Sequence, residues 1–232
     1  MKKTIFLTAI LIAALGFTGC GGSEKNGGDL NINATVKFGD TLNDEVDEVR
    51  AVGFVYVSDG NWENVIIANA PYKNGGFEIT LPKKIDERLL APMDFEGLFP
   101  IDVTASNKKV KSTSIDKLYA FKNNTLVGRF ENTYNGSDVD ASSMYIFVDG
   151  NCKISGYDSY TDSSSGTPYT CEITIDLNLK KGWNTVYATF ATISGDAIIY
   201  TLKTQKPAFD LIWYFENGSV YFAPQKSLKP FN

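Results

Sequence analysis

Three cysteines carry the most distinctive side-chain chemistry in this 232-residue chain: Cys20, Cys152 and Cys171. Cys20 follows a basic start at Lys2-Lys3, an apolar stretch at residues 5–15 and a short run of small residues. This order is typical of an export signal, and its apolar stretch is too short to span a bilayer core. Residues 1–20 therefore predict an export signal that ends in a cysteine.

The end of that signal, Phe17-Thr18-Gly19-Cys20, resembles the lipobox of bacterial lipoproteins, in which the cysteine thiol is acylated and becomes the new N-terminus. Phe17 departs from the pattern, because lipoboxes usually carry Leu there. The resemblance implies a lipidated Cys20 at the cell envelope, as an outer-membrane lipoprotein facing the periplasm or the cell surface. Each buried acyl methylene contributes about 0.8 kcal/mol, so two or three acyl chains would anchor the protein. The alternative is an ordinary cleaved signal that leaves Cys20 as a free thiol.

Cys152 and Cys171 are candidates for a disulfide. Counting by two from Cys171 to Ile173 and from Cys152 to Ile154 places both thiols on apolar strand faces. If the two cysteines face each other, their strands fold back near Thr161-Asp162, and the closed loop would stabilise the fold by about 3 kcal/mol. The alternative is two separate buried thiols.

Histidine is absent, which excludes Ser-His-Asp, Cys-His and His-metal chemistry. Two aspartate pairs, Asp138 with Asp140 and Asp158 with Asp162, lack the Gly and terminal Glu of a calcium loop, so we interpret them as turn residues. Carboxylate pairs for glycoside hydrolysis stay open, because the sequence does not give the separation of two carboxylates, although 27 acidic residues offer some pair by chance. We expect a protein that is not an enzyme and has no metal or cofactor.

The charge balance argues against polyanionic partners. Removal of residues 1–20 leaves 20 basic and 27 acidic residues and changes the formal net charge from −5 to −7. An acidic chain without a basic stripe repels phosphate backbones, so no nucleic-acid partner is expected.

Composition and periodicity favour strands. Aromatic residues make up 13% of the chain, and residues 21–30 are too polar to pack, which predicts a flexible tether. Cys171 to Leu179 alternates apolar and polar residues over nine positions, and the next strand should bury Val186, Ala188 and Phe190 by the same rule. Further strands are predicted at residues 34–38, 52–57, 62–68, 77–82, 118–121, 126–130, 144–148, 197–203 and 211–215, with a final hairpin to 220–222.

Two further resemblances concern the fold. Residues 75–82, GGFEITLP, resemble a strand of transthyretin-like and carboxypeptidase-regulatory-like β-sandwich domains. Residues 144–156 and 176–190, MYIFVDGNCKISG and DLNLKKGWNTVYATF, resemble the C-terminal part of uncharacterised lipoproteins from Bacteroidota. The second resemblance implies lipidation and β architecture, and no activity.

The expected fold is mostly β, made of antiparallel β-sandwiches. We predict two immunoglobulin- or transthyretin-like sandwich domains after the signal peptide, at residues 31–108 and 109–232. The division falls at the charged run of residues 108–112, read as a linker, and a single elongated sandwich is the alternative.

Aromatic residues suggest where a partner would bind. Tyr157, Tyr160 and Tyr169 lie among Ser, Thr, Asp and Gly, a mixture resembling adaptable paratopes, so we predict a binding loop there for a glycan or protein ligand. Trp183 and Trp213 are interpreted as structural.

We therefore expect a membrane-anchored, non-catalytic binding or structural module. One alternative is a glycan-binding protein of a polysaccharide-uptake system. Another is a fimbrillin-like pilus subunit, because such proteins are lipidated β-sandwiches cleaved after an Arg that precedes a strand, as Arg50 precedes Ala51 here.

Overall fold

A computed structural model describes residues 28–58, 61–93, 101–162, 169–193, 197–217 and 229–230. The predicted signal peptide, Cys20 and all but the last residues of the predicted tether lie outside these ranges. The residues of the predicted 220–222 strand also lie outside them.

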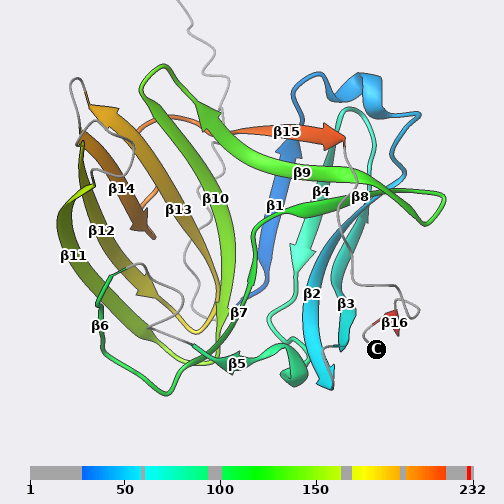
Figure 1. Ribbon diagram of the computed structural model, residues 1–232. Helices are drawn as coiled ribbons and strands as arrows, with labels where there is room; N and C mark the ends of the chain where they lie inside the picture. The colour runs from blue at the N-terminus through cyan, green and yellow to red at the C-terminus, as the bar shows by residue number, and fades with distance from the viewer. Residues whose placement is uncertain are drawn as a thin grey trace, which may run out of the picture.

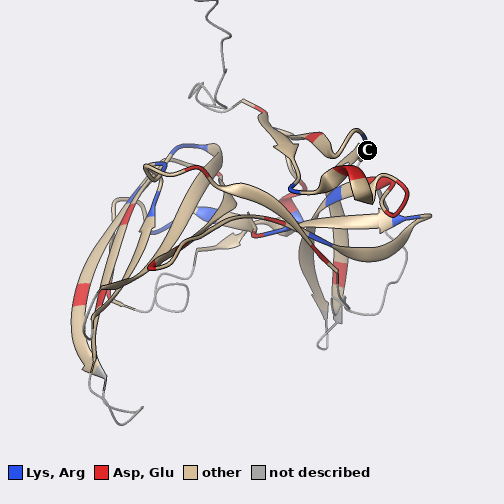
Figure 2. Cartoon of the chain, turned by 90° about the horizontal axis from the view of Figure 1, so that it is seen from above, with Lys and Arg blue, Asp and Glu red and all other residues tan. Residues whose placement is uncertain are grey.

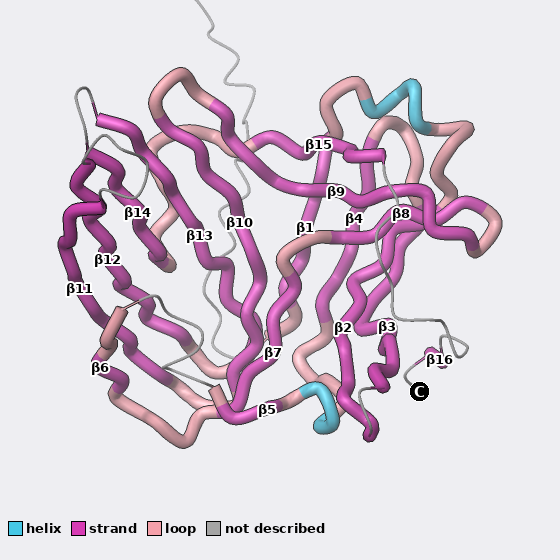
Figure 3. The backbone as a smooth tube through the Cα atoms, in the orientation of Figure 1, coloured by secondary structure: helices cyan, strands magenta, loops and turns pink. Residues whose placement is uncertain are grey.

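The described chain is mostly β, which confirms the predicted fold class (Figure 3). Two 3-10 turns, η1 (Gly39–Leu42) and η2 (Glu87–Leu89), are its helical elements. The strands are β1 (Leu30–Thr35), β2 (Glu48–Ser58), β3 (Asn61–Pro71), β4 (Gly76–Leu81), β5 (Ala91–Pro92), β6 (Thr104–Ala105), β7 (Lys111–Ile115), β8 (Leu118–Lys122), β9 (Thr125–Asn135), β10 (Val139–Val148), β11 (Cys152–Asp162), β12 (Tyr169–Leu179), β13 (Gly182–Ile193), β14 (Ala197–Lys203), β15 (Ile212–Asn217) and β16 (Lys229–Pro230).

The strands form two lobes that share one continuous sheet (Figures 1 and 2). Its hydrogen-bonded order is β16-β3-β2-β8-β9-β10-β13-β14-β12-β11-β6, with β15 beside β9, and β7 between β5 and the lower end of β10. β1 and β4 form a separate two-stranded sheet in the first lobe. β9 pairs with β8 and β15 and then with β10, so this strand joins the lobes.

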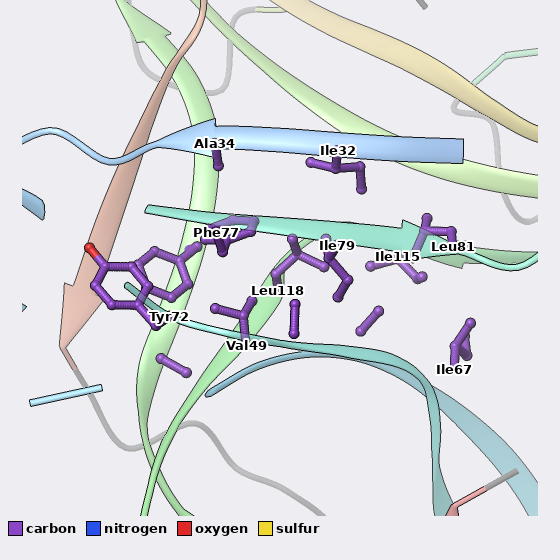
Figure 4. Packing of buried hydrophobic residues seen from close by; sticks show 14 of the residues in the cluster. Ile32, Ala34, Val49, Ile67, Tyr72, Phe77, Ile79, Leu81, Ile115 and Leu118 are labelled. Atoms are coloured by element: carbon purple, nitrogen blue, oxygen red, sulfur yellow. The ribbon is translucent and has the colours of Figure 1, made fainter. Parts of the chain in front are cut away.

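The first lobe is a sandwich in which the β1–β4 pair covers one face of the larger sheet. Alternation in β4 buries Phe77, Ile79 and Leu81 and leaves Glu78 and Thr80 exposed, as predicted. These side chains meet those of β2 and β8 in a single hydrophobic cluster (Figure 4). Burial of such side chains contributes roughly 1.5–3 kcal/mol each, which is why this face sets the pairing.

The second lobe is a curved sheet of β10, β13, β14, β12 and β11. The predicted alternation in β12 is confirmed, because Cys171, Ile173, Ile175, Leu177 and Leu179 are all buried. They pack in a second cluster with side chains from β10, β11, β13 and β14 and with Met93, Ile101, Val103, Ala105 and Val110. We call the face that carries this cluster the inner face.

The two clusters do not divide at residues 108 and 109. The first includes Ile115, Leu118 and Trp213, whereas the second includes Met93 and Ile101. The division into two domains at that point stays a prediction. The predicted linker at residues 108–112 is corrected in part, because Val110 is buried and Lys111 begins β7.

The sequence did not predict the parallel pairing of β14 with β12. β14 is antiparallel to β13, its neighbour in the chain, but parallel to β12. β15 pairs with β9 across the first lobe.

The predicted disulfide is wrong. Both Cys152 and Cys171 are free thiols, and they do not face each other: Cys152 lies opposite Leu179, and Cys171 lies opposite Tyr160. Their predicted places on the apolar face are confirmed, because both side chains belong to the second cluster. The hairpin exists, but its register is shifted by eight residues from the one that would join the cysteines.

Candidate functional site

The inner face of the second lobe carries a row of five side chains on five neighbouring strands. The ladder pairs Asp140 of β10 with Phe190 of β13, Phe190 with Tyr200 of β14, Tyr200 with Ile173 of β12, and Ile173 with Asp158 of β11. Directly paired residues project from the same face of a sheet. We call these five residues the aromatic row.

A second row lies next to it, toward the end of the sheet. Thr192 pairs with Ile198, Ile198 with Cys171, and Cys171 with Tyr160. We call these four residues the rim row. Two residues along a strand advance about 7 Å, so the two rows lie about 7 Å apart along the strands.

On the other side, the aromatic row borders the closed part of the inner face. The adjacent row ends at Gly156, where a Cβ would lie 2.8 Å from the backbone oxygen of Asp102, 2.9 Å from Val103 and 3.1 Å from Ile101. The segment from Ile101 therefore covers the inner face as far as Gly156. This packing requires a residue without a side chain at position 156. In the next row Asp158 is exposed, although its partner Ile173 is buried.

Burial differs from strand to strand within the two rows. On β12, Ile173 is 4% exposed and Cys171 is 9% exposed, whereas Phe190 on β13 is 43% exposed and Tyr160 on β11 is 47% exposed. The prediction that Phe190 is buried is therefore wrong: Phe190 lies near the end of β13, between the exposed Asp140 and the half-buried Tyr200. Phe190 and Tyr160 are thus partly exposed aromatic side chains on the same sheet face as the second cluster.

Tyr200 lies between them and is half-buried. Burial raises the pKa of Tyr200, so its hydroxyl keeps its proton at neutral pH and can donate or accept a hydrogen bond. The carboxylates of Asp140 and Asp158 at the two ends of the row are exposed. The row thus has an apolar centre and acidic ends.

The structure separates the three predicted binding tyrosines. Tyr157 and Tyr160 belong to β11, and Tyr169 begins β12, so they are strand residues, while residues 163–168 of the predicted loop lie outside the described residues. Tyr160 and Tyr169 project from the inner face, where Tyr169 packs against the second cluster. Tyr157 is 65% exposed on the opposite face, paired with Thr174.

Sequence reasoning missed Phe190, Tyr200 and the role of Asp140 and Asp158 as neighbours of these rings. Alternation in residues 186–190 placed Phe190 on the inner face, which was correct. The parallel pairing of β14 with β12 has no local signal, so the row itself could not be assembled from the sequence.

Trp183 and Trp213 lie outside the aromatic and rim rows and make structural contacts. Trp183 donates its indole N–H to the backbone oxygen of Pro82 at 2.9 Å and meets Phe147 edge-on. Trp213 is buried, with its ring edge-on to Phe77. These contacts confirm the structural interpretation of both residues.

Arg50, the predicted cleavage residue of the pilus alternative, is 7% exposed near the start of β2. It forms an ion pair with Glu48, and its guanidinium lies 4.0 Å from the centre of the Phe121 ring. It also pairs with Asn69 and Tyr119 on the neighbouring strands. A protease could reach the bond after Arg50 only if β2 left the sheet.

Within the described ranges no group of three or more His, Cys, Asp or Glu side chains could hold a metal ion, and no helix there is long and apolar enough to cross a membrane. The chain matches no protein-family model, no curated protein and no solved structure.

Proposed function

We propose that this protein is a lipid-anchored, non-catalytic binding module of the cell envelope, and that it binds its ligand on the aromatic and rim rows. The observation that carries the proposal is the exposure of Phe190 and Tyr160 on the same sheet face as the second hydrophobic cluster. Exposed aromatic rings beside a hydrophobic cluster can supply the apolar contacts of a ligand site. The rings stand on paired strands, so little conformational entropy is lost when a ligand binds.

The anchor and the lack of catalysis rest on the sequence. The signal-like residues before Cys20 support lipidation at the outer membrane, with the protein facing the periplasm or the cell surface. The absence of histidine removes the usual general base, and the one thiol of the two open rows, Cys171, has no basic side chain paired with it.

A glycan is one candidate ligand class, as in a polysaccharide-uptake system. Ring faces such as that of Phe190 stack on sugar rings, and carboxylates such as Asp140 and Asp158 accept hydrogen bonds from hydroxyl groups. The pilus role has less support, because it needs cleavage after the buried Arg50.

The binding site is tested with a matched pair of tyrosine variants from one strand. Binding to a glycan array or to extracts of envelope components should be lost or reduced about tenfold in Tyr160→Ala and Phe190→Ala. Tyr157→Ala removes a more exposed tyrosine from the opposite face and should bind as the wild type does. Equal effects of Tyr157→Ala and Tyr160→Ala would contradict this location.

The anchor is tested separately. Cys20→Ala should move the protein from the membrane fraction to the soluble periplasm or leave an uncleaved precursor, and the mass of the mature N-terminus should show the acyl chains. A normally processed product with unchanged partitioning would contradict lipidation.

A further inference from the structure

The β2–β3 hairpin carries three exposed aromatic side chains close to the end of β2, at the lower edge of the first lobe (Figure 1). Phe54 is 42% exposed, Tyr56 is 57% exposed and Trp62 is 51% exposed. Tyr56 pairs directly with Trp62, and Phe54 lies two residues before Tyr56 on β2, so the three side chains project from one face of the hairpin. We call them the hairpin rings.

The hairpin rings form an uninterrupted open surface. Tyr56 and Trp62 are direct neighbours across the two strands, and their ring centroids are 5.3 Å apart. The surface ends at Asn64, which pairs with Phe54 and is buried, and at Val52, which is buried in a small separate cluster. A ligand on the rings therefore needs no contact with a buried side chain.

The planes of the Tyr56 and Trp62 rings are inclined to each other by 70°. Two rings at this angle do not make one flat platform for a sugar ring, but their faces can both contact one compact group. Because the centroids are 5.3 Å apart, such a group can lie within about 6 Å of both, the distance at which an aromatic ring attracts a cation. Phe54 adds a third ring about 7 Å further along β2.

The strand positions around the rings are uncharged. On this face of the hairpin the ladder places Val52, Phe54, Tyr56, Trp62, Asn64 and Ile66. The face of an aromatic ring is the negative end of its quadrupole, so it attracts cations and repels anions. A primary ammonium group has three N–H donors that need acceptors, and these six positions offer no carboxylate. A quaternary ammonium group has no N–H donor and spreads its charge over its methyl groups, so ring faces suffice to bind it.

We infer that the hairpin rings bind a quaternary ammonium group, such as the trimethylammonium end of choline, with its methyl groups against the faces of Tyr56 and Trp62. Pairing on two adjacent strands holds these rings in place before a ligand arrives, so little conformational entropy is lost on binding. The site lies in the first lobe and shares no residue with the aromatic and rim rows, so it goes beyond the proposed function.

The inference is tested by calorimetric titration of the full chain with choline at constant ionic strength. The matched control is the neutral alcohol in which a tert-butyl group replaces the trimethylammonium group of choline, because it has the same shape without the charge. Choline should bind at least about tenfold more tightly than this alcohol, which corresponds to about 1.4 kcal/mol. Equal binding of the two compounds, or no binding of choline, would overturn the inference.

Ring variants locate the bound cation. Tyr56→Leu and Trp62→Leu should each weaken choline binding about two- to tenfold. Tyr56→Phe and Trp62→Phe keep a ring at each position and should bind choline more tightly than the Leu variants, which separates the ring from general loosening of the hairpin. Tyr157→Leu removes an exposed tyrosine from the second lobe and should bind as the wild type does. Equal binding by the Leu and Phe variants would overturn the role of the rings.

Further titrations separate the source of the group and the two proposals. Tighter binding of glycerophosphocholine than of glycine betaine would assign the site to a lipid headgroup, and the reverse order to a free small molecule. Phe190→Ala, which tests the aromatic row, should leave choline binding unchanged. Choline binding that is lost in Phe190→Ala but kept in Trp62→Leu would overturn this location. A soluble oligosaccharide that binds the wild type but not Trp62→Leu, with no binding of choline, would replace the cation by a glycan.

Discussion

Cys171 lies directly opposite Tyr160 in the β11–β12 hairpin, which places Cys152 opposite Leu179. The two cysteines are therefore eight residues apart along the ladder, about 26 Å at strand spacing. A disulfide needs Cα atoms about 4.4–6.8 Å apart. No local adjustment can join the two thiols while this ladder stays formed.

We therefore expect Cys152 and Cys171 to be reduced in the folded protein. Alkylation of the unreduced, denatured protein should add one group to each, detected by peptide mass spectrometry. A protein that gains these two adducts only after reduction would contradict the β11–β12 register.

The cysteine error shows what periodicity can and cannot predict. The side-chain period of a strand is two, so alternation assigns each residue to a face, and both thiols were assigned correctly. A register shift by an even number of residues leaves every side chain on the same face of the sheet. The alternation therefore cannot distinguish the observed register from one shifted by eight residues. The register here is set by the length of the connection between the strands, which begins after Asp162 and not at Thr161.

The strands themselves were largely predictable, because local alternation and turn residues set them. β4 and β14 match their predicted ranges within a residue, and β12 begins two residues earlier than predicted. The candidate site was not predictable as a unit, since its five strands come from residues 139–203 and one pairing is parallel between non-consecutive strands. Tyr160 was identified from its polar neighbours, but the same signal selected Tyr157, which lies on the other face.

Gly156 offers a test of the segment at Ile101 to Val103 that packs against it. Gly156→Ala would place a methyl group 2.8 Å from the Asp102 backbone oxygen, so either β11 or the covering segment must shift. We expect a loss of about 1–3 kcal/mol in the free energy of unfolding, measured by urea denaturation. Gly150→Ala is the matched control, because its nearest atom, in Asn107, is 3.4 Å away, and it should change stability little. Equal stability of both variants would mean that the segment does not rest on Gly156.

The Glu48–Arg50 pair should make the first lobe sensitive to acid. Partial burial opposes ionisation of Glu48, but hydrogen bonds from Arg50 and Asn69 outweigh it and hold the pKa of the Glu48 carboxyl below its usual value. A carboxyl whose pKa is lowered by folding stabilises the protein above its unfolded pKa, near 4.5, and that contribution is lost as the pH falls through the folded pKa.

Glu48→Gln should therefore destabilise the protein at pH 7 by about 1–3 kcal/mol, because it leaves the buried Arg50 guanidinium without its counter-charge. The difference from the wild type, measured by chemical denaturation, should shrink as the pH falls below 4.5. Glu78→Gln on the exposed face of β4 is the control and should change stability little at either pH. A constant difference at all pH values would assign the loss to packing and not to the charge.

Tyr72 should make the first lobe sensitive to alkali in the opposite sense. Burial, helped by the nearby Asp40 charge, raises the pKa of Tyr72 to about 12. Its hydroxyl donates to the backbone oxygen of Gly39 at 3.0 Å, and its ring stacks on Phe130 with centroids 5.4 Å apart. The folded protein thus favours the protonated form of the Tyr72 side chain.

A tyrosine whose pKa is raised by folding stabilises the protein below its unfolded pKa, near 10, and the contribution is lost as the pH rises toward 12. Tyr72→Phe keeps the ring but removes the hydroxyl, so it should cost about 1 kcal/mol at pH 7. Between pH 10 and 12 the wild type should lose stability faster than Tyr72→Phe, and the two unfolding free energies should converge. Tyr119, whose pKa burial also raises to about 12, is present in both proteins, so alkaline destabilisation persists in the variant. Parallel loss of stability in both proteins across this range would show that the Tyr72 hydroxyl ionises as freely in the folded chain as in the unfolded one.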